Sequence, residues 1–299
     1  MCRLLLFISP NHQLIPLSYM VTDAPHSISK QSYADPYLPG MRWFKHINHR
    51  NPKWNLDGYG IYYRFIENDQ LKLHKYKSKN PIVNIDTFET NKKLKDQTQS
   101  KDIYWATIFI RNNNFKDKYP NTFQSVQPFK FKNYLFSHNG GFNTHLKNYL
   151  PKIKKYIKNK KYYDKQMENI NVDSRWLFSL FLNYVNSDNY ENLESLKKDI
   201  EKFLHVMHKI KDNDFNISMN LLFTNLNNDT QIILRYRTCN QLPPTLYYNK
   251  VHPLGYFVSS EPIDFEPGWK LMRNQLIIIK DDQFKSYKLS PKTINCVKT

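Results

Sequence analysis

A cysteine directly follows the initiator methionine in the opening stretch MCRLLLFISP. If Met1 is removed, Cys2 becomes the first residue and carries a free α-amine beside its thiol. Such an amine has a pKa of about 7.7–8.0 and can accept the proton of a thiol whose own pKa is about 8.5. One residue can then supply both the nucleophile and the base, as an N-terminal threonine does in other enzymes. The alternatives are an incidental small residue near a chain end, or part of a signal peptide.

The apolar run after Cys2 does not fit a signal peptide. LLLFI has five residues, fewer than the roughly 7–15 of a hydrophobic signal region, and no small-residue cleavage site follows it. No stretch of the sequence approaches the ~18 apolar residues of a membrane span. We therefore expect residues 3–8 to form a short buried strand, in a cytoplasmic protein that does not contact membranes.

Four further residues that could bind a charged or polar group of a substrate lie at the ends of predicted elements. They are Arg111 at the end of a strand over 103–111, Asn139 and Gly140 where the strand within 129–142 reaches a glycine turn, and Asp173 at the start of a helix over 172–185. Each also has an ordinary explanation. A strand-end arginine is usually solvated, Asn-Gly usually forms a turn, and an aspartate or serine at a helix start usually caps the helix.

Glycine is scarce and unevenly distributed. The chain has seven glycines, whereas an average usage of about 7% would give roughly 21. Four of them lie in DGYG (57–60) and HNGG (138–141). In a chain that otherwise avoids glycine, these positions indicate backbone that needs positive φ or approaches another group closely. The alternative is two tight turns at strand ends.

The formal net charge of +18 raises the question of nucleic-acid binding. The lysines are spread along the chain and are densest over 149–165, and the sequence has no zinc-finger, basic-zipper or RRM-like signature. We expect no specific nucleic-acid binding. A weak, salt-sensitive attraction to polyanions is the alternative.

The three cysteines are Cys2, Cys239 and Cys296. They are far apart and lack C-x-x-C spacing, so the sequence predicts neither a disulfide framework nor a zinc site. This suits a reducing compartment. We expect no metal and no cofactor.

The order of the predicted elements is strands, then helices, then strands. Strands are predicted over 3–8, 57–65, 71–77, 103–111, 129–142, 217–225, 230–237, 245–249, 255–260 and 275–280, and helices over 84–97, 172–185 and 192–211. This order indicates an α+β fold with antiparallel sheets and argues against a doubly wound sheet. We expect a single domain, with a Lys/Tyr-rich surface insertion or loop near 151–170. A division into two domains at that stretch is the alternative.

Taken in order, these features resemble the class II glutamine amidotransferase domain, an N-terminal-nucleophile hydrolase. The likeness is greatest to its stand-alone branch, which includes the fungal amidotransferase-like subunit of glutathione breakdown and the γ-glutamyl hydrolase of ergothioneine synthesis. It covers nearly the whole chain and is carried by MCRLLLF (1–7), APHSISKQS (24–32), NLDGYGIYY (55–63), LFSHNGGF (135–142), DSRWLFSLFL (173–182), MNLLFTN (219–225), LRYR (234–237) and VSSEPIDFEPGW (258–269). The resemblance implies one domain over 2–299, folded as a four-layer αββα sandwich of two antiparallel sheets.

The resemblance also implies an activity, which is cleavage of the γ-glutamyl amide bond of glutamine or a γ-glutamyl peptide through a γ-glutamyl thioester. The implied roles are Cys2 as nucleophile, the Asn139 side-chain amide and the Gly140 N–H as oxyanion hole, Arg111 as ligand of the substrate α-carboxylate, Asp173 as ligand of its α-ammonium, and Asn114 as a residue that lines the glutamyl pocket. The implied substrate is a small molecule. Any ammonia transfer or further peptide breakdown would require a separate synthase or peptidase partner chain.

The sequence departs from the family pattern around these residues. The usual His-x-Arg-x-x-Thr is FIRNNN (109–114), with Phe109 for the histidine and Asn114 for the threonine, and the usual His-Pro-Phe is QPF, with Gln127 for the histidine. At the helix start, Arg175 replaces a glutamate, where it either directs its charge towards Asp173 or the amine of the substrate, or faces solvent. These changes leave open a weakened or inactive binding or regulatory subunit. A polyanion-binding protein is a third hypothesis, which rests on the net charge.

Overall fold

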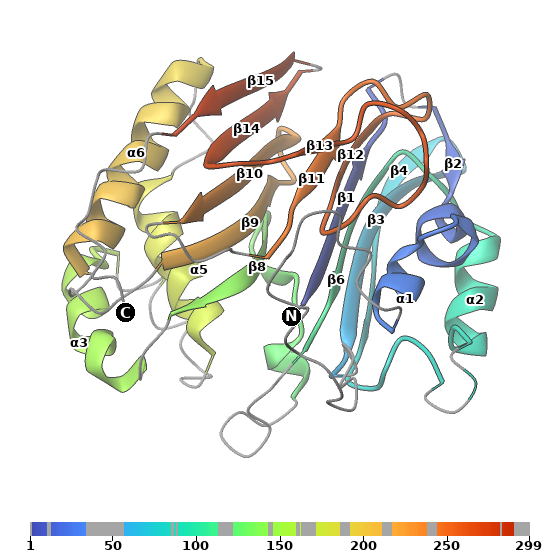
Figure 1. The fold of residues 1–299 in the computed structure, drawn as a ribbon, viewed down its shortest axis with the longest axis horizontal. Coiled ribbons are helices and arrows are strands. Elements are labelled where there is room, and N and C mark those ends of the chain that lie inside the picture. Colours follow the sequence, from blue (N-terminus) through green and yellow to red (C-terminus); the bar gives the residue numbers. More distant parts are fainter. Residues whose placement is uncertain are drawn as a thin grey trace. The chain divides into compact units, whose positions relative to one another are not determined.

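The polypeptide folds as two units, each built on one large antiparallel sheet (Figure 1). Unit 1 comprises Met1–Pro128 and Pro244–Met272, and unit 2 comprises Phe129–Pro243 and Arg273–Thr299. The computed structural model describes residues 2–10, 13–33, 57–84, 87, 89–112, 122–142, 146–159, 162, 172–185, 192–210, 217–237, 244–281 and 283–289.

Within the described residues, the sheet of unit 1 has seven strands in the order β13-β11-β12-β1-β6-β3-β4. These strands are β1 (Arg3–Ile8), β3 (Tyr59–Glu67), β4 (Gln70–Ser78), β6 (Trp105–Ile110), β11 (Tyr247–Asn249), β12 (Tyr256–Ser259) and β13 (Lys270–Leu271). A smaller sheet pairs β2 (Ile15–Pro16) with β5 (Asp102–Ile103). The helices are α1 (Ile28–Gln31) and α2 (Lys92–Gln99), with short turns of π- and 3-10 helix at Tyr19–Asp23 and Phe123–Ser125.

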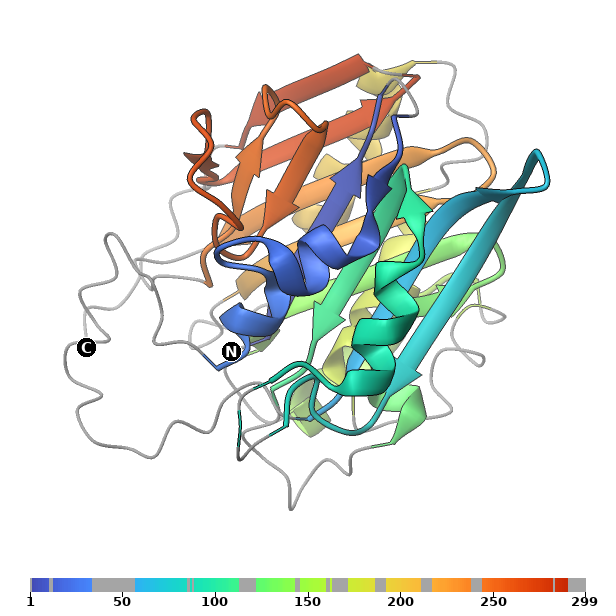
Figure 2. The ribbon, with the colours of Figure 1, turned by 90° about the vertical axis from the view of Figure 1, so that its right-hand side faces the viewer.

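Strand β1 lies in the middle of this sheet and is paired on both sides. Helices α1 and α2 cover one face of this sheet (Figure 2). Leu5 and Phe7 belong to the apolar core on that face. Leu4 and Leu6 point to the opposite face and are equally buried. A strand that is buried on both faces is apolar at consecutive positions, which explains the continuous apolar run after Cys2.

Two residues, Asn68 and Asp69, connect β3 to β4. Both have positive φ angles, 52° and 56°. Positive φ at both central positions is the geometry of the type I′ turn, whose twist matches that of a two-residue hairpin. The predicted strand pair on either side of this turn is confirmed, with Glu67 opposite Gln70.

A buried carboxylate, Asp264, holds the segment between β12 and β13 against the rest of unit 1. Its Oδ2 accepts a hydrogen bond from the Tyr19 hydroxyl at 2.7 Å and lies 2.9 Å from His252 Nε2, and its Oδ1 accepts from Trp269 Nε1 at 2.9 Å. Burial by itself would raise the pKa of Asp264, but the hydrogen bonds from His252, Trp269 and Tyr19 outweigh it and lower this pKa to about 2. The folded state therefore contains the ionised carboxylate.

An acid whose pKa is lowered by folding stabilises the fold above its unfolded pKa, which is about 3.9 for aspartate, and this contribution is lost as the pH falls through the folded pKa. We expect Asp264→Asn to lower the free energy of unfolding at neutral pH, and the difference from wild type to shrink between about pH 4 and pH 2. Urea titrations across this range measure it. The exposed turn variant Asp69→Asn is the control, and parallel pH curves for wild type and Asp264→Asn would contradict the assignment.

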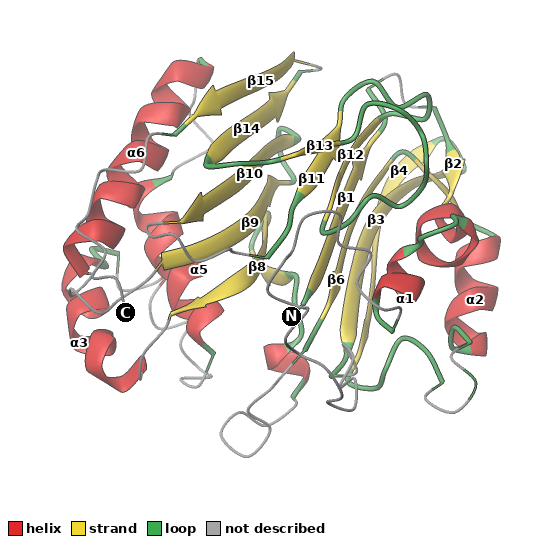
Figure 3. Ribbon diagram, viewed as in Figure 1, coloured by secondary structure: helices red, strands yellow, loops and turns green. Residues whose placement is uncertain are grey.

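In the described part of unit 2, six strands form the sheet in the order β15-β14-β10-β9-β8-β7. They are β7 (Phe129–Phe131), β8 (Tyr134–Phe142), β9 (Ile217–Asn225), β10 (Thr230–Arg237), β14 (Gln275–Lys280) and β15 (Gln283–Lys288). Helices α3 (Leu146–Tyr156), α5 (Asp173–Tyr184) and α6 (Leu193–Ile210) lie along one face of this sheet (Figure 3).

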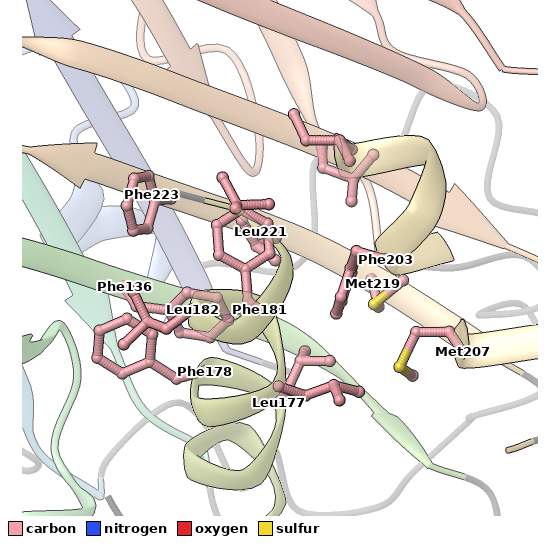
Figure 4. Packing of buried hydrophobic residues seen from close by; sticks show 14 of the residues in the cluster. Phe136, Leu177, Phe178, Phe181, Leu182, Phe203, Met207, Met219, Leu221 and Phe223 are labelled. Carbon is pink, nitrogen blue, oxygen red and sulfur yellow. The ribbon is translucent and has the colours of Figure 1, made fainter. Parts of the chain in front are cut away.

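The core of unit 2 lies between its sheet and helices α5 and α6 (Figure 4). Phe136 of β8 stacks on Phe178 of α5, with the ring centroids 4.7 Å apart. Phe181 contacts Phe203 of α6 and Phe223 of β9, with centroid separations of 5.2 and 5.0 Å. Aromatic pairs at such distances add to the stabilisation from burial. This packing fixes the start of α5 relative to β8.

The predicted α+β class with antiparallel sheets is confirmed, and so is the order of strands, helices and strands. The helix predicted over 192–211 is α6, and the strands predicted over 217–225 and 230–237 are β9 and β10. The single domain over 2–299 stays a prediction. Among the described elements, no helix is both long enough and apolar enough to cross a membrane.

One predicted helix begins later than expected. The sequence predicted a helix over 84–97, whereas α2 begins at Lys92. The side chain of Asn91 caps it by accepting a hydrogen bond from the Lys93 N–H at 3.1 Å. An asparagine at this position satisfies a backbone donor that the helix itself leaves unpaired, and this sets the start of the helix.

The stretch near 151–170 was expected to be a surface insertion or loop, and its first part needs correction. Residues 151–156 belong to α3, and Ile153 and Ile157 are buried in the core of unit 2. The many lysines and an internal proline, Pro151, concealed this helix, because proline normally argues against a helix interior. Residues 163–170 lie outside the described residues.

Candidate active site

Cys2 and Arg111 lie at the same end of the central strands of unit 1. In the antiparallel ladder between β1 and β6, Arg3 is opposite Ile110, so the next position brings Cys2 opposite Arg111. The pairing of β6 with β3 also continues, since Arg111 N donates to the Gly58 carbonyl at 2.8 Å. The DGYG motif, Arg111 and Cys2 are therefore neighbours.

Strand alternation gives Cys2 and Arg111 the same face of the sheet. Successive side chains of a strand point to opposite faces, and residues directly opposite each other in a ladder share a face. Leu5 and Ile110 belong to the core on the helix-covered face, so Cys2 and Arg111 point to the other face, together with Leu4.

The sulfur of Cys2 is held by the backbone of the residue after Arg111. Asn112 N donates to Cys2 Sγ at 3.3 Å, and the thiol lies 3.6 Å from the Asn112 carbonyl oxygen, to which it can donate. Cys2 itself is half-buried. An N–H aimed at the sulfur stabilises negative charge there, as a nucleophilic thiolate needs.

The guanidinium of Arg111 is nearly buried and oriented by a serine. Arg111 Nη1 donates to Ser125 Oγ at 2.8 Å. Ser125 is fixed in turn, because its hydroxyl donates to the Thr122 carbonyl at 2.7 Å and accepts from Thr122 N at 3.1 Å. An arginine that is held in one orientation presents its planar fork to a carboxylate with little loss of side-chain freedom.

In unit 2, Asn139 and Gly140 lie within β8 and not in a turn. The strand continues through Phe142 and pairs with β9, with Asn139 opposite Asn220 and Gly140 opposite Met219. The expected glycine turn at this place is wrong. Asn139 is buried, whereas Gly140 is exposed.

Gly140 is required by the close approach of β9. A Cβ atom at this position would lie 2.0 Å from the Ser218 carbonyl oxygen and 2.8 Å from His138 Nε2. No side chain fits at such distances, so the expectation of a close backbone approach is confirmed here. The sequence also indicated glycines that need a positive φ angle. Gly58 of DGYG confirms this, because its φ is 101°.

Asp173 is the first residue of α5 and is connected to β8 through Ser174. Asp173 Oδ1 accepts from Ser174 N at 2.7 Å, and Ser174 Oγ, 3.2 Å from the same oxygen, is 2.9 Å from His138 Nδ1. The helix cap expected at Asp173 or Ser174 is wrong, because the N-cap is Val172. A carboxylate in the first turn is nonetheless favoured by the helix dipole.

His138 is a buried titratable residue that the sequence reasoning did not single out. Burial lowers the pKa of His138, while the charge of Asp173 and the Ser218 backbone act in the opposite direction. The neutral imidazole is therefore favoured at neutral pH. Its position directly before Asn139, in the HNGG motif, was the available signal.

The residues at which the sequence departs from the resembled motifs are mostly packed against other side chains. Phe109 is fully buried in β6 opposite Leu4, as expected for a packing residue. Arg175 packs against an aromatic ring, since its guanidinium lies 4.5 Å from the ring centroid of Phe129, a cation–π distance. Gln127 is buried. Asn114 lies outside the described residues.

The five predicted residues whose surroundings are described thus fall into two groups. Cys2 and Arg111 are brought together in unit 1, and Asn139, Gly140 and Asp173 are brought together in unit 2. Among the residues that the structure describes, no group of three or more His, Cys, Asp or Glu is placed to hold a metal ion.

Comparisons with known proteins bear on the fold. No protein-family model matches the chain, and no curated protein matches its sequence. Among solved structures, the fold is similar to that of a glutamine aminotransferase class-II domain protein from Silicibacter pomeroyi, with a TM-score of 0.55 and 14% sequence identity, over 97% of this chain and 100% of that one. The fold is therefore class II glutamine amidotransferase-like, and at this identity the likeness extends to the fold alone.

The close approach at Gly140 gives a prediction for stability. We expect Gly140→Ala to push β8 and β9 apart and to lower the free energy of unfolding by about 1–3 kcal/mol, the usual cost of overpacking. Denaturant unfolding of the purified variant measures it. Ser137→Ala, in the same buried strand, is the matched control, since the Ser137 hydroxyl has no hydrogen-bond partner among the described residues. A Gly140→Ala protein as stable as this control would contradict the geometry.

Proposed function

We propose that the chain is a γ-glutamyl amide hydrolase of the class II amidotransferase type, with Cys2 as its nucleophile once Met1 has been removed. The observation that supports this most directly is the juxtaposition of Cys2 and Arg111 at the end of the β1–β6 ladder, on one face of the sheet. A thiol beside an oriented guanidinium suits a substrate that carries a carboxylate a few bonds from its reacting carbon. The proposal includes the four-layer αββα sandwich and the roles of Asn139, Gly140 and Asp173 that the resemblance implies.

The first half of the reaction forms a thioester. The α-amine of processed Cys2 accepts the thiol proton, and the thiolate attacks the γ-carbonyl carbon of the substrate. The bond between that carbon and the amide nitrogen then breaks, and the nitrogen leaves as ammonia or an amine after taking the proton from the Cys2 ammonium. The Asn112 N–H, 3.3 Å from the sulfur, supports the thiolate before attack.

The second half consumes water. The α-amine takes a proton from a water molecule, the resulting hydroxide attacks the thioester carbonyl, and the carbon–sulfur bond breaks to give glutamate and the free thiol. In both halves negative charge develops on the carbonyl oxygen. The Asn139 side chain and the Gly140 N–H are the proposed donors to this oxygen, and the loss of one such donor typically lowers turnover roughly 10²–10³-fold.

The remaining groups recognise the glutamyl end of the substrate. Arg111 binds the α-carboxylate, with its orientation set by Ser125. Asp173 binds the α-ammonium, and its contact with Ser174 leaves Oδ2 available for a second donor. Asn114 is proposed to line the same pocket. No cofactor takes part.

A binding or regulatory subunit with weak or no turnover is the second candidate. The observation that favours it is Phe109, a fully buried aromatic residue where the resembled family has a histidine beside its arginine. In either case the protein is proposed to act in the cytoplasm on a small γ-glutamyl compound. A separate synthase or peptidase chain would use the products.

The test is glutamate release from glutamine and from a panel of γ-glutamyl peptides by protein whose intact mass shows the loss of Met1. We expect turnover with at least one substrate, no turnover by Cys2→Ala, and a drop of about 10²–10³-fold for Asn139→Ala. Absence of release by processed wild type, together with binding of a γ-glutamyl ligand, would favour the second candidate. Absence of both release and binding would refute both.

A further inference from the structure

Three sequence motifs near the candidate nucleophile have no part in the proposed chemistry. They are the arginine of MCR, the loop APHSISKQS, and SSEP, which begins at the last residue of β12. In unit 1 they meet in a buried cluster of polar side chains that we call the Arg3 network, defined by Arg3, His26, Gln31, Ser260 and Glu261. Its Arg3 is next to Cys2 in the sequence but points to the other face of the sheet.

Arg3 binds two partners from distant parts of the chain. Its Nη2 forms an ion pair with Glu261 Oε1 at 2.8 Å, and its Nε donates to the Gln31 carbonyl at 3.0 Å. The exposed fraction is 8% for Arg3 and 1% for Glu261. Two donors of one guanidinium, used in different directions, fix the side chain more tightly than a lysine could.

Glu261 depends on this arrangement because it is almost completely buried. Burial raises its pKa, and the charges of Arg3 and His26 oppose that effect. His26 Nε2 lies 3.5 Å from Glu261 Oε2. A buried carboxylate that loses its cation is strongly destabilising, so the ion pair holds both partners in place.

The backbone around the network is held as well. Gln31 Nε2 donates to the carbonyls of His26 and Glu261, both at 3.1 Å. Leu4 N donates to Ser260 Oγ at 2.9 Å, and Ser260 N donates to the Leu4 carbonyl at 2.9 Å. The start of β1 is therefore attached to α1 and to the segment after β12, in addition to its pairing with β6.

We propose that Arg3 is a positioning residue for Cys2, and that its ion pair with Glu261 sets the face of the sheet to which the nucleophile points. Arg3 shares the helix-covered face with Leu5, so anchoring it there places Cys2 on the opposite face with Arg111. A slip of one residue would exchange the two faces. The expected effect of Arg3 on glutamate release rests on the proposed function. Its expected effect on the position and reactivity of the Cys2 thiol does not.

Cys2 needs such an anchor because it precedes the first paired residue of β1. The first residues of a chain are poorly ordered unless something holds them, and a reacting group must be kept within roughly 0.5 Å of its productive place. A misplacement of about 1 Å can lower the rate ~10²-fold. The Asn112 backbone contacts the sulfur itself, and the side chain of Arg3, one residue away, adds an anchor on the chain that carries Cys2.

The test compares Arg3→Met with Arg64→Met, with intact mass confirming removal of Met1 in each. Arg64 is also a buried arginine of this sheet, but it is opposite Trp105 at the far end of the β3–β6 ladder and lies 5.8 Å from the ring centroid of that tryptophan. One readout is the rate of Cys2 alkylation by iodoacetamide, followed by mass spectrometry of the N-terminal peptide. The other is kcat and KM for glutamate release.

We expect Arg3→Met to change the alkylation rate of Cys2 at least ~10-fold and to lower kcat ~10²-fold with KM within about twofold, because Arg111 and Asp173 still bind the substrate. Arg64→Met should leave both readouts near wild type. Arg3→Lys keeps one cation for Glu261 but not the second bond to Gln31, so it should recover part of kcat.

A second variant separates positioning from stability. Arg3→Met leaves the buried Glu261 charge without its closest cation and can unfold the chain, whereas Arg3→Met combined with Glu261→Gln removes that charge. The double variant should regain stability but keep the altered Cys2 alkylation and the low kcat. Recovery of wild-type alkylation and kcat in the double variant would overturn the positioning role. If the Arg3 variants change Cys2 alkylation as expected but the wild-type protein releases no glutamate, the proposed function fails and the positioning role of Arg3 stands.

Discussion

The pairing of β1 between β6 and β12 is the constraint on which the candidate site depends. It fixes the register that brings Cys2 opposite Arg111, and it fixes which face each side chain takes. Since the side-chain period of a strand is two residues, a register error of one residue would move the thiol to the helix-covered core. The apolar run LLLFI secures the register by burial on both faces, and the ion pair between Arg3 and Glu261 secures it at the end next to Cys2.

The second group of candidate residues is placed by a related device in unit 2. Strand β9 approaches β8 so closely that position 140 accepts only glycine, and this leaves the Gly140 N–H and the adjacent Asn139 in a rigid, well-paired strand. Ser174 and His138 then connect that strand to Asp173 at the start of α5. In both units the candidate residues lie on paired strands, next to them, or at the start of a helix that packs on them, so the backbone around each of them is held.

Residue types, order and apolar patterns were sufficient to predict the α+β class and most strands. Patterns of local sequence were insufficient where distant segments decide the structure. HNGG is typical of a turn, yet the pairing of Gly140 with Met219 extends the strand. Ile153 and Ile157 are buried because α3 packs on the core of unit 2, which the surrounding lysines concealed. The role of Arg3 was invisible for the same reason, since its partners Gln31 and Glu261 are adjacent to it only in the folded chain.

The most direct test of the central claim, that processed Cys2 is a nucleophile directed at a glutamyl group, is the intact mass of the protein after reaction with a diazoketone analogue of glutamine. The diazo carbon of the analogue would take a proton from the Cys2 ammonium, and the thiolate would then displace dinitrogen from that carbon to form a thioether. The account predicts a chain without Met1 that carries one adduct, located on Cys2 and prevented by excess glutamine or the γ-glutamyl substrate. A processed chain without an adduct, or with the adduct only on Cys239 or Cys296, would contradict it.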